Sequence, residues 1–255
     1  MDIVGKGFLA RHLSEAFSGS FPEVTAFAAG VSSTSVTAAE EFDREAALLY
    51  RVLRRCREQR RVLLFFSTAS FAMYGSRQEP AAEDGPLFPP TAYGRHKLAL
   101  ESSIRSAGVP HLILRVSHLV GRHQRAHQLL PAMTRQVQSG SVTVYESAYR
   151  DLLDVSDLVY VTGRLLEDGA EGDTLNVVSG TPVPVDRLVD GIEERLGLTP
   201  MRVLVPAQGS VARTLVSTEQ LEKLVPGFGA ERVGAGYLER ILDAYLPYYA
   251  SLPAA

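Results

Sequence analysis

Two continuous apolar runs constrain the fold of this chain most strongly. Residues 62–66 read Val-Leu-Leu-Phe-Phe and residues 111–116 read His-Leu-Ile-Leu-Arg-Val. Runs of this length and composition are typical of strands that are buried on both faces of a parallel sheet. Residues 41–59 place apolar side chains at helical spacing, and a second helix is expected near 92–107. The Pro-, Glu- and Gly-rich residues 76–90 are expected to form a loop, and later helices are expected near 218–224 and at 235–246. Because strands alternate with helices, the sequence predicts an α/β fold with a parallel sheet and right-handed crossovers.

The bulk properties favour one domain. A chain of 255 residues with 45% hydrophobic residues can bury one large core with a small appended lobe. We find no internal repeat or linker, so residues 1–255 are expected to form a single domain. Its substrate-binding cap should come mainly from about 122–150 and 180–255.

The net charge and the cysteine content limit which binding partners and which cellular compartment we expect. The formal charge of −3 gives no reason to expect nucleic acid, and no apolar run is long enough to cross a bilayer. Cys56 is the single cysteine, which excludes an intrachain disulfide and fits a reducing cytoplasm. We therefore expect a soluble cytoplasmic protein that has no nucleic-acid partner, no membrane partner and no metal site.

The N-terminal segment has the order of a phosphate-binding turn. Residues 2–4 predict a very short strand, Gly5-Lys6-Gly7-Phe8-Leu9-Ala10 follows at once, and a helix should then run to about Phe17. Gly5 permits a tight turn, Gly7 lets a pyrophosphate approach the backbone, and Ala10 allows close packing of helix on strand. The alternative is an ordinary turn between a strand and a helix.

Tyr93 and Lys97 are the candidate acid–base pair. They are four residues apart, so a helix places the phenol and the ammonium on one face. A nearby ammonium stabilises a phenolate, and such a pair can move a proton on or off a substrate oxygen at neutral pH. The alternative is a surface Tyr and Lys that have this spacing by chance.

Several segments in the same order resemble one family. The chain is similar to the extended short-chain dehydrogenase/reductases, the NAD-dependent epimerases, dehydratases and reductases of nucleotide sugars, from residue 3 to about residue 197. This resemblance implies a Rossmann-like sheet. It rests on Gly-Lys-Gly-Phe-Leu-Ala at 5–10, Phe-Ala-Ala at 27–29, Phe-Ser-Thr-Ala-Ser at 66–70, Met-Tyr-Gly at 73–75, Tyr-Gly-Arg-His-Lys-Leu-Ala-Leu-Glu at 93–101, Leu-Arg-Val-Ser-His-Leu-Val-Gly at 114–121, Arg-Asp-Leu-Leu-Asp-Val-Ser-Asp-Leu at 150–158 and Leu-Asn-Val-Val-Ser-Gly at 175–180.

The resemblance implies a role for individual residues. Tyr93 would be the acid/base, Lys97 its partner and a ribose contact, and Ser70 the supporting hydroxyl, with Ser67 or Thr68 as the fallback. Any one of these hydroxyls can equally be a cap at the strand end. NAD or NADP would contact Gly5, Lys6, Gly7, Phe8, Leu9, Ala28, Ala29, Ser67, Lys97 and Val116. The substrate, a nucleotide sugar, would contact Ser70, Tyr93, His118 and Arg150, although Arg150 can instead pair with Asp151 or Asp154.

Three features depart from the family pattern. Only one helix and one turn separate Gly7 from Ala28, where the family has two further strands that bind the cofactor's adenosine. Residues 2–4 are therefore expected at the sheet edge. Glu45 stands where the family usually has Asn, and the glycine turn is one residue tighter than usual. The part of the site that carries the acid–base residues resembles the family, whereas the part that binds the cofactor's adenosine is expected to be missing.

Three functions are consistent with these residues. The first is an NAD(P)-dependent reductase, epimerase or dehydratase of a nucleotide-activated sugar. The second is an enzyme on the same scaffold that lacks a dinucleotide, with Tyr93 acting alone as acid or base. The third is a non-catalytic binding homologue, which the joint presence of Tyr93 and Lys97 disfavours. We also expect a homodimer built from the 41–59 and 92–107 helices, which carry apolar residues on more than one face, at Ala46, Leu49, Tyr50, Leu53, Leu98, Ala99 and Ile104.

Overall fold

A five-stranded parallel sheet forms the centre of the protein. We describe it from a computed structural model that covers residues 1–31, 38–206 and 213–252. The strand order is β1-β2-β3-β5-β10, and every neighbouring pair is parallel. The strands are β1 (Asp2–Val4), β2 (Val24–Phe27), β3 (Val62–Thr68), β5 (His111–Val116) and β10 (Thr174–Val177). The predicted α/β fold with a parallel Rossmann-like sheet is confirmed.

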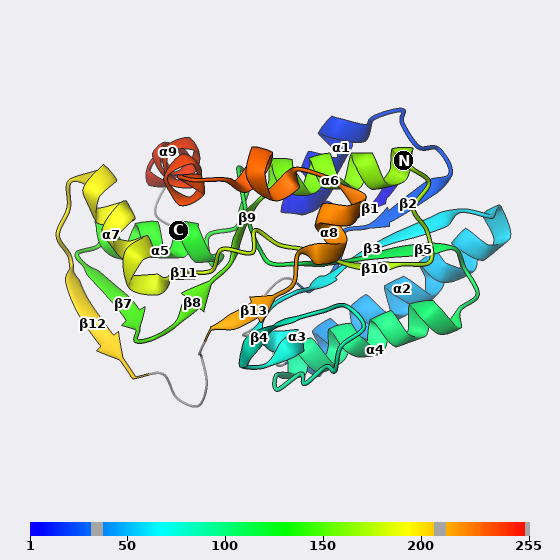
Figure 1. Ribbon diagram of the computed structural model, residues 1–255, viewed down its shortest axis with the longest axis horizontal. Helices are drawn as coiled ribbons and strands as arrows, with labels where there is room; N and C mark the ends of the chain where they lie inside the picture. Colours follow the sequence, from blue (N-terminus) through cyan, green and yellow to red (C-terminus); the bar gives the residue numbers. More distant parts are fainter. Residues whose placement is uncertain (32–37, 207–212, 253–255) are drawn as a thin grey trace.

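Helices cover both faces of this sheet (Figure 1). One layer holds α1 (Phe8–Phe17) and α6 (Val155–Glu167), and the other holds α2 (Ala39–Gln59) and α4 (Ala92–Ser106). Successive residues of β3 alternate between the layers: Leu63 and Phe65 face α2 and α4, whereas Leu64 and Phe66 face the opposite core. This alternation explains why the strand is apolar at every position.

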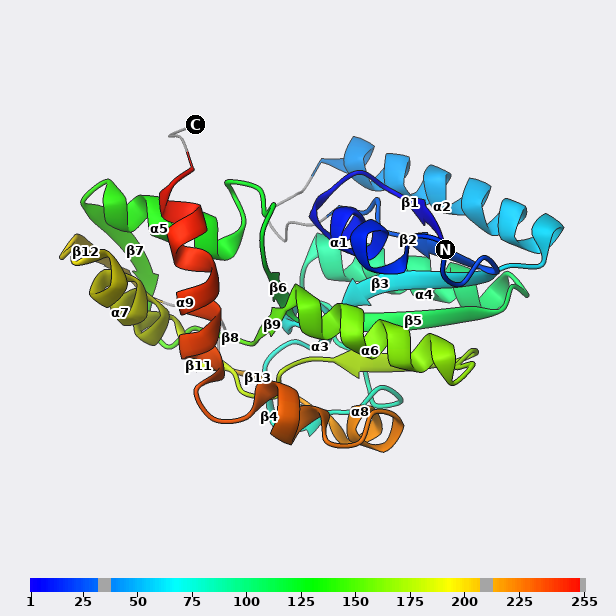
Figure 2. The ribbon, with the colours of Figure 1, turned by 90° about the horizontal axis from the view of Figure 1, so that it is seen from above.

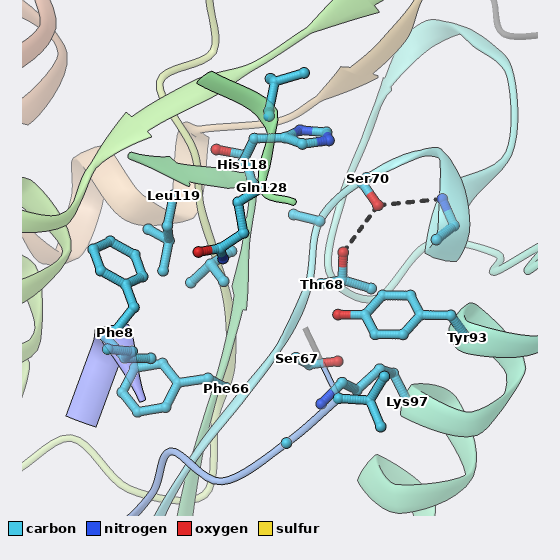
Figure 3. Close-up of a pocket in the computed structure, with 18 of the residues that line it drawn as sticks. Phe8, Phe66, Ser67, Thr68, Ser70, Tyr93, Lys97, His118, Leu119 and Gln128 are labelled. Carbon is cyan, nitrogen blue, oxygen red and sulfur yellow. Dashed lines mark hydrogen bonds between the residues drawn. The ribbon is translucent and has the colours of Figure 1, made fainter. Parts of the chain in front are cut away.

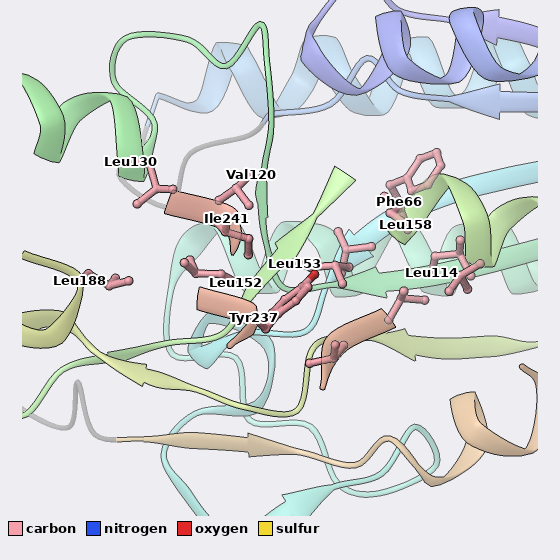
Figure 4. Packing of buried hydrophobic residues seen from close by; sticks show 14 of the residues in the cluster. Phe66, Leu114, Val120, Leu130, Leu152, Leu153, Leu158, Leu188, Tyr237 and Ile241 are labelled. Carbon is pink, nitrogen blue, oxygen red and sulfur yellow. The ribbon is translucent and has the colours of Figure 1, made fainter. Parts of the chain in front are cut away.

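A second lobe lies beside the sheet (Figures 1 and 2). It contains α5 (Leu129–Gln138), α7 (Val185–Leu196), α9 (Tyr237–Ala250) and the parallel pair β7 (Ser141–Tyr145) and β12 (Met201–Val205). One apolar cluster runs from the sheet into this lobe, from Phe66 and Leu114 through Leu153 to Ile241 and Leu188 (Figure 4). The two lobes therefore share a continuous core.

Short elements connect the lobes. They are the parallel pairs β6 (His118–Val120) with β9 (Leu152–Asp154) and β4 (Arg77–Ala81) with β13 (Thr214–Val216), the antiparallel pair β8 (Tyr149–Arg150) with β11 (Val183–Pro184), the helices α3 (Phe71–Tyr74) and α8 (Glu219–Leu224), and the π-helix η1 (Phe228–Val233). The sequence predicted α8, but the short strand pairs are too short to show a hydrophobic period and were not predicted.

Buried tyrosines of α9 form hydrogen bonds with the rest of the protein. The Tyr249 hydroxyl donates to the carbonyl of Gly121 at 2.8 Å, and the Tyr237 hydroxyl donates to the carboxylate of Asp157 at 2.6 Å. Each phenol is thus buried with a hydrogen-bond acceptor, as a buried tyrosine requires. The last helix is consequently part of the shared core.

Several sequence predictions can be compared directly with the structure. The long helices and the buried strands occur where the sequence predicted them, and β1 is the edge strand of the described sheet, as expected. The prediction that 76–90 is entirely loop was wrong, because Arg77–Ala81 pairs with a strand more than 130 residues later. The last helix was predicted at 235–246, but it begins at Tyr237, after Gly236 with φ +73°, and continues through Pro247. Within the described ranges, no helix combines the length and hydrophobicity that crossing a membrane would need.

Candidate active site

The carboxyl ends of the central strands open into a cavity of about 860 Å³ (Figure 3). One wall consists of the segments that follow four strands: residues 6–9 after β1, 28–31 after β2, 69–72 after β3 and 117–119 after β5. The opposite wall includes residues between 124 and 129 and residues 149–151. Ligands of open α/β sheets bind in this position, outside the carboxyl ends of the strands.

The glycine turn leaves the start of α1 open to the cavity. Gly5 has φ +141°, and a Cβ there would lie 2.4 Å from the carbonyl oxygen of Ala28, so the turn requires glycine. Gly7 precedes α1 without a side-chain cap, and no atom of the described residues lies within 4 Å of a Cβ built on it. The first amides of α1 and the positive end of its dipole therefore face space in which a phosphate would fit.

Helix α4 presents the predicted acid–base pair. Thr91 caps the helix, because its hydroxyl accepts a hydrogen bond from the Gly94 amide at 3.0 Å. Tyr93 and Lys97 are 9% and 3% exposed and both line the cavity, with the Lys97 Nζ 5.7 Å from the centre of the Tyr93 ring. Burial raises the pKa of Tyr93, the charge of Lys97 opposes that rise, and the nearby carboxylate of Glu45 adds to it.

Two hydroxyls at the end of β3 lie on the side of Tyr93: Thr68 is the last residue of the strand, and Ser70 follows it. The Ser70 Oγ accepts a hydrogen bond from the Ala72 amide at 3.2 Å, as the cap of α3, and lies 2.9 Å from the Thr68 Oγ1. Thr68 is closer to the phenol: the Tyr93 hydroxyl points toward it in Figure 3, and its hydrogen bond lowers the pKa of Tyr93. Thr68, the fallback in the sequence prediction, therefore has the geometry expected of the third member.

An additional carboxylate approaches this site from α2. The Lys97 Nζ donates to the Glu45 Oε1 at 2.7 Å, and Glu45 Oε2 contacts the His96 ring at 3.1 Å and the Val31 amide at 2.9 Å. Burial opposes the ionisation of Glu45, but the His96 hydrogen bond, the Lys97 charge and the Val31 amide outweigh it and lower the pKa of Glu45 to about 2. The residue that departs from the family pattern is thus the ion-pair partner of Lys97.

The far end of the cavity holds a cation without a counter-ion. Arg150 is half-buried, and among the described residues it forms no ion pair; its guanidinium donates to the carbonyl of Tyr149 at 2.7 Å. Burial lowers the pKa of Arg150. Burial and the charge of Arg150 together lower the pKa of His118 to about 4, so His118 is neutral at pH 7.

The two alternative partners of Arg150 are engaged elsewhere. The Asp151 carboxylate accepts hydrogen bonds from the amides of Ser179 and Gly180, at 3.0 and 2.8 Å. The Asp154 carboxylate caps α6 and accepts from the Tyr245 hydroxyl at 2.8 Å. The possibility that Arg150 merely pairs with one of these residues is therefore not realised.

Nearly all of the sequence-predicted site residues meet in this cavity. Of the residues predicted to contact cofactor or substrate, Gly5 alone does not line it, because Gly5 packs behind the turn. The sequence analysis missed many lining residues, which include Gly30, Val31, Leu119, Gln124, Arg125, His127, Gln128, Tyr149 and Thr214. The run of Gln, His and Arg after Gly121 was the one signal that could have indicated some of them.

The residues present fit part of a nicotinamide dinucleotide. The uncapped start of α1 suits a pyrophosphate, and Lys97 and Tyr93 line the same cavity, where they could contact a ribose and a substrate. The described sheet has no strand beyond β1, which is where dinucleotide folds carry the acidic residue that binds the adenosine ribose. The expected loss of the adenosine side stays a prediction.

Comparison with known sequences identifies a family. The model of the "NAD dependent epimerase/dehydratase family" matches residues 5–178. The dTDP-4-dehydro-6-deoxyglucose reductase of Escherichia coli is 26% identical over 147 residues, which cover 52% of this chain and 45% of that protein. The chain thus spans less than half the length of this curated relative.

Comparison with solved structures supports the same fold. RMD from Pseudomonas aeruginosa, solved with NADPH, has a TM-score of 0.82 at 20% identity and covers 98% of each chain. MoeE5, solved with UDP-glucose and NAD, has a TM-score of 0.83 at 21% identity and covers 97% of this chain and 98% of its own. The family model matches well over half of the chain, from the glycine turn to the end of the central sheet, and the protein therefore belongs to the NAD dependent epimerase/dehydratase family.

Proposed function

We propose that this protein is an NAD(P)-dependent oxidoreductase or epimerase of the extended short-chain dehydrogenase type that acts on a nucleotide-activated sugar. The observation that carries the proposal is the meeting of Tyr93, Lys97 and Thr68 with the open start of α1 in one cavity. Relatives with this fold include a dTDP-sugar reductase and a protein solved with UDP-glucose and NAD.

Each residue has a defined part in this reaction. Tyr93 passes a proton to or from the substrate oxygen, Thr68 donates a hydrogen bond to the same oxygen, and Lys97 contacts the ribose and stabilises the phenolate. Gly7 and the amides of α1 hold the pyrophosphate. Bound NAD(P) supplies the group that accepts or donates the hydride.

Arg150 and His118 are the proposed substrate contacts. Arg150 is a half-buried guanidinium without an ion-pair partner among the described residues, and planar guanidinium groups bind phosphate oxygens in pairs. His118 is neutral beside it and can both donate and accept hydrogen bonds. We assign Arg150 to the diphosphate of the substrate, with the second lobe, about 122–150 and 180–255, as the substrate-binding cap.

The edge position of β1 favours a second candidate function. Without the strands that bind adenosine, the same scaffold can act without a dinucleotide, with Tyr93 as the sole acid or base. If a dinucleotide does bind, we expect the nicotinamide and phosphate half to supply most of the affinity. Reduced nicotinamide mononucleotide should then bind nearly as tightly as NADH.

Ligand-induced stabilisation tests the proposal. NADH, NADPH or both, at about a hundred times the dissociation constant, should raise the free energy of unfolding by about 2.7 kcal/mol, which is roughly 6–10 °C in Tm for a chain of this size. Adenosine, which carries no phosphate, is the control for the expected loss of the adenosine site and should give little shift. Oxidation of NADPH with dTDP-4-dehydro-6-deoxyglucose, and reduction of NAD with UDP-glucose, then test turnover. If neither dinucleotide shifts Tm, the cofactor-independent candidate replaces this proposal.

The two candidate hydroxyls can be separated by substitution. Thr68→Val keeps the shape of the side chain but removes the hydrogen bond to Tyr93, so kcat/KM should fall by tenfold or more. Ser70→Ala removes the hydroxyl that caps α3 and contacts the Thr68 hydroxyl, and we expect a smaller fall in kcat/KM. Steady-state kinetics of both variants, with thermal unfolding as the folding control, decide the assignment; a larger loss in Ser70→Ala reverses it.

The homodimer is a further part of the proposal. Leu49, Leu53 and Ile104 pack against the sheet, so the outer surface of α2 and α4 offers Tyr50 and Ala99. We expect light scattering to give twice the mass of the chain, and Tyr50→Glu to restore the monomer mass. Tyr145→Glu changes another exposed tyrosine, in the second lobe, and should leave the dimer intact. A wild-type monomer at micromolar concentration contradicts this prediction.

A further inference from the structure

We propose that Glu45 is a positioning residue whose carboxylate holds the Lys97 ammonium and cancels its charge beside Tyr93, so that Tyr93 is a neutral proton donor suited to substrates with a carbonyl oxygen. The inference rests on the proposed function, which it deepens: it assigns the site to protonation of a keto group during reduction. It concerns Glu45 because this sequence departs from the family pattern there.

The contacts of Glu45 show that this arrangement is built into the fold. Glu45 and Lys97 are each 3% exposed, and they meet at 2.7 Å although they come from different helices. The second carboxylate oxygen accepts from the Val31 amide at 2.9 Å. A Cβ on Gly30 would lie 2.5 Å from the Glu45 Oε1 and 2.7 Å from the Lys97 Nζ, so the chain after β2 leaves room for this ion pair only with glycine there.

The charges around Tyr93 follow from these contacts. The groups that face Glu45 and Tyr93 are the Lys97 ammonium and the His96 ring from α4, the Val31 amide after β2 and the Thr68 hydroxyl from β3. An ammonium alone would favour the phenolate in so buried a place, but its carboxylate partner opposes that effect. Burial and Glu45 then both favour the neutral phenol, which is the form that can donate a proton.

The Glu45 carboxylate carries its negative charge at neutral pH. The contacts of Glu45 lower its pKa to about 2, so the carboxylate is ionised at any pH near neutrality. Glu45→Gln keeps the size of the side chain and an acceptor oxygen for Lys97, but it removes the negative charge. Lys97 then acts on Tyr93 without compensation, and the phenol should ionise at lower pH.

The titration of Tyr93 measures this effect without a substrate or a cofactor. Protein labelled with ¹³C at the tyrosine ring carbon that bears the hydroxyl is titrated by NMR, and the Tyr93 signal is identified by its absence from Tyr93→Phe. At a pH below both midpoints, we expect the tyrosinate fraction of Tyr93 to be about tenfold higher in Glu45→Gln than in the wild type. Asp43→Asn removes a carboxylate from the same helix that has no contact with the site, and it should leave the titration unchanged.

The outcomes distinguish this inference from the proposed function. An unchanged or raised midpoint in Glu45→Gln overturns the inference, as does a wild-type Tyr93 that is already ionised at pH 7; the latter result needs no variant to fold. Glu45→Asn provides a second uncharged variant if Glu45→Gln unfolds. If the midpoint falls but no nucleotide sugar is turned over, the inference stands and the proposed function fails. If keto-sugar reduction is found, its alkaline limb should move to lower pH in Glu45→Gln, because the phenolate cannot donate a proton.

Discussion

Replacing Tyr93 by Phe is expected to lower kcat/KM by roughly 10²–10⁴-fold, which is the contribution that general acid–base catalysis makes in enzymes. The variant loses one oxygen that is directed at the cavity and at Thr68, and the ring keeps its packing beside Lys97. We therefore expect the free energy of unfolding to change by no more than about 1 kcal/mol. The measurement is steady-state kinetics with the nucleotide sugar that the wild type turns over, together with urea unfolding.

A matched variant shows whether the loss is specific to this phenol. Tyr160 on α6 is 38% exposed and outside the cavity, and Tyr160→Phe removes the same oxygen without affecting the site. Its kcat/KM should equal that of the wild type. If Tyr93→Phe keeps full activity, Tyr93 is not the acid–base residue, and the roles that we assign to Lys97 and Thr68 fail with it.

Removing the Arg115 guanidinium should cause the largest loss of stability that we expect from a single substitution. Arg115 on β5 is 1% exposed and donates to both oxygens of Glu101, at 3.0 and 2.7 Å, while Glu101 is completely buried. The same guanidinium also donates to the Tyr74 hydroxyl at 2.9 Å. Arg115→Met leaves the carboxylate buried, with the half-exposed Arg105 as its one remaining ion-pair partner among the described residues. Breaking such a pair is expected to lower the free energy of unfolding by about 3–5 kcal/mol.

Two further variants separate the cost of an unpaired buried carboxylate from the cost of lost side-chain packing. Replacing both partners, as in Arg115→Met with Glu101→Leu, should recover much of the stability because no unpaired carboxylate is left. Arg164→Met breaks the ion pair with Glu167, in which both side chains are about half exposed and the nitrogen and oxygen are 3.5 Å apart. The free energy of unfolding should change by less than about 1 kcal/mol. Equal losses in Arg115→Met and Arg164→Met, measured by urea unfolding, contradict the expected role of burial.

The central sheet was predictable because its signals are local. The strand at 62–66 is apolar at every position because both of its faces are covered, and Leu49, Leu53 and Cys56 of α2 repeat at helical spacing because one side of the helix packs on the sheet. Pairing between distant short strands leaves no such pattern. Arg77–Ala81 contains a proline and few apolar residues, and its partner begins at Thr214, so a loop was the natural interpretation.

The site was predictable in part for a similar reason. Tyr93 and Lys97 are close in the sequence, and their spacing on one helix is a local signal that the sequence itself displays. The partnership of Lys97 with Glu45 joins two helices across 52 residues, and no local pattern indicates it. The resemblance favoured Ser70 over Thr68, but the Ser70 hydroxyl caps the short helix α3 and contacts Thr68, which the sequence did not indicate.

The shared core has a consequence for how the protein is made. Ile241, Leu242, Leu246 and Tyr249 of α9 belong to the same apolar cluster as Leu64 and Leu114 of the central sheet. During synthesis the sheet strands leave the ribosome long before this helix does, and until then part of their apolar surface is exposed to water and to other chains. Ribosome-bound chains that stop short of residue 237 should therefore be the ones that general chaperones hold, and release should coincide with the emergence of α9.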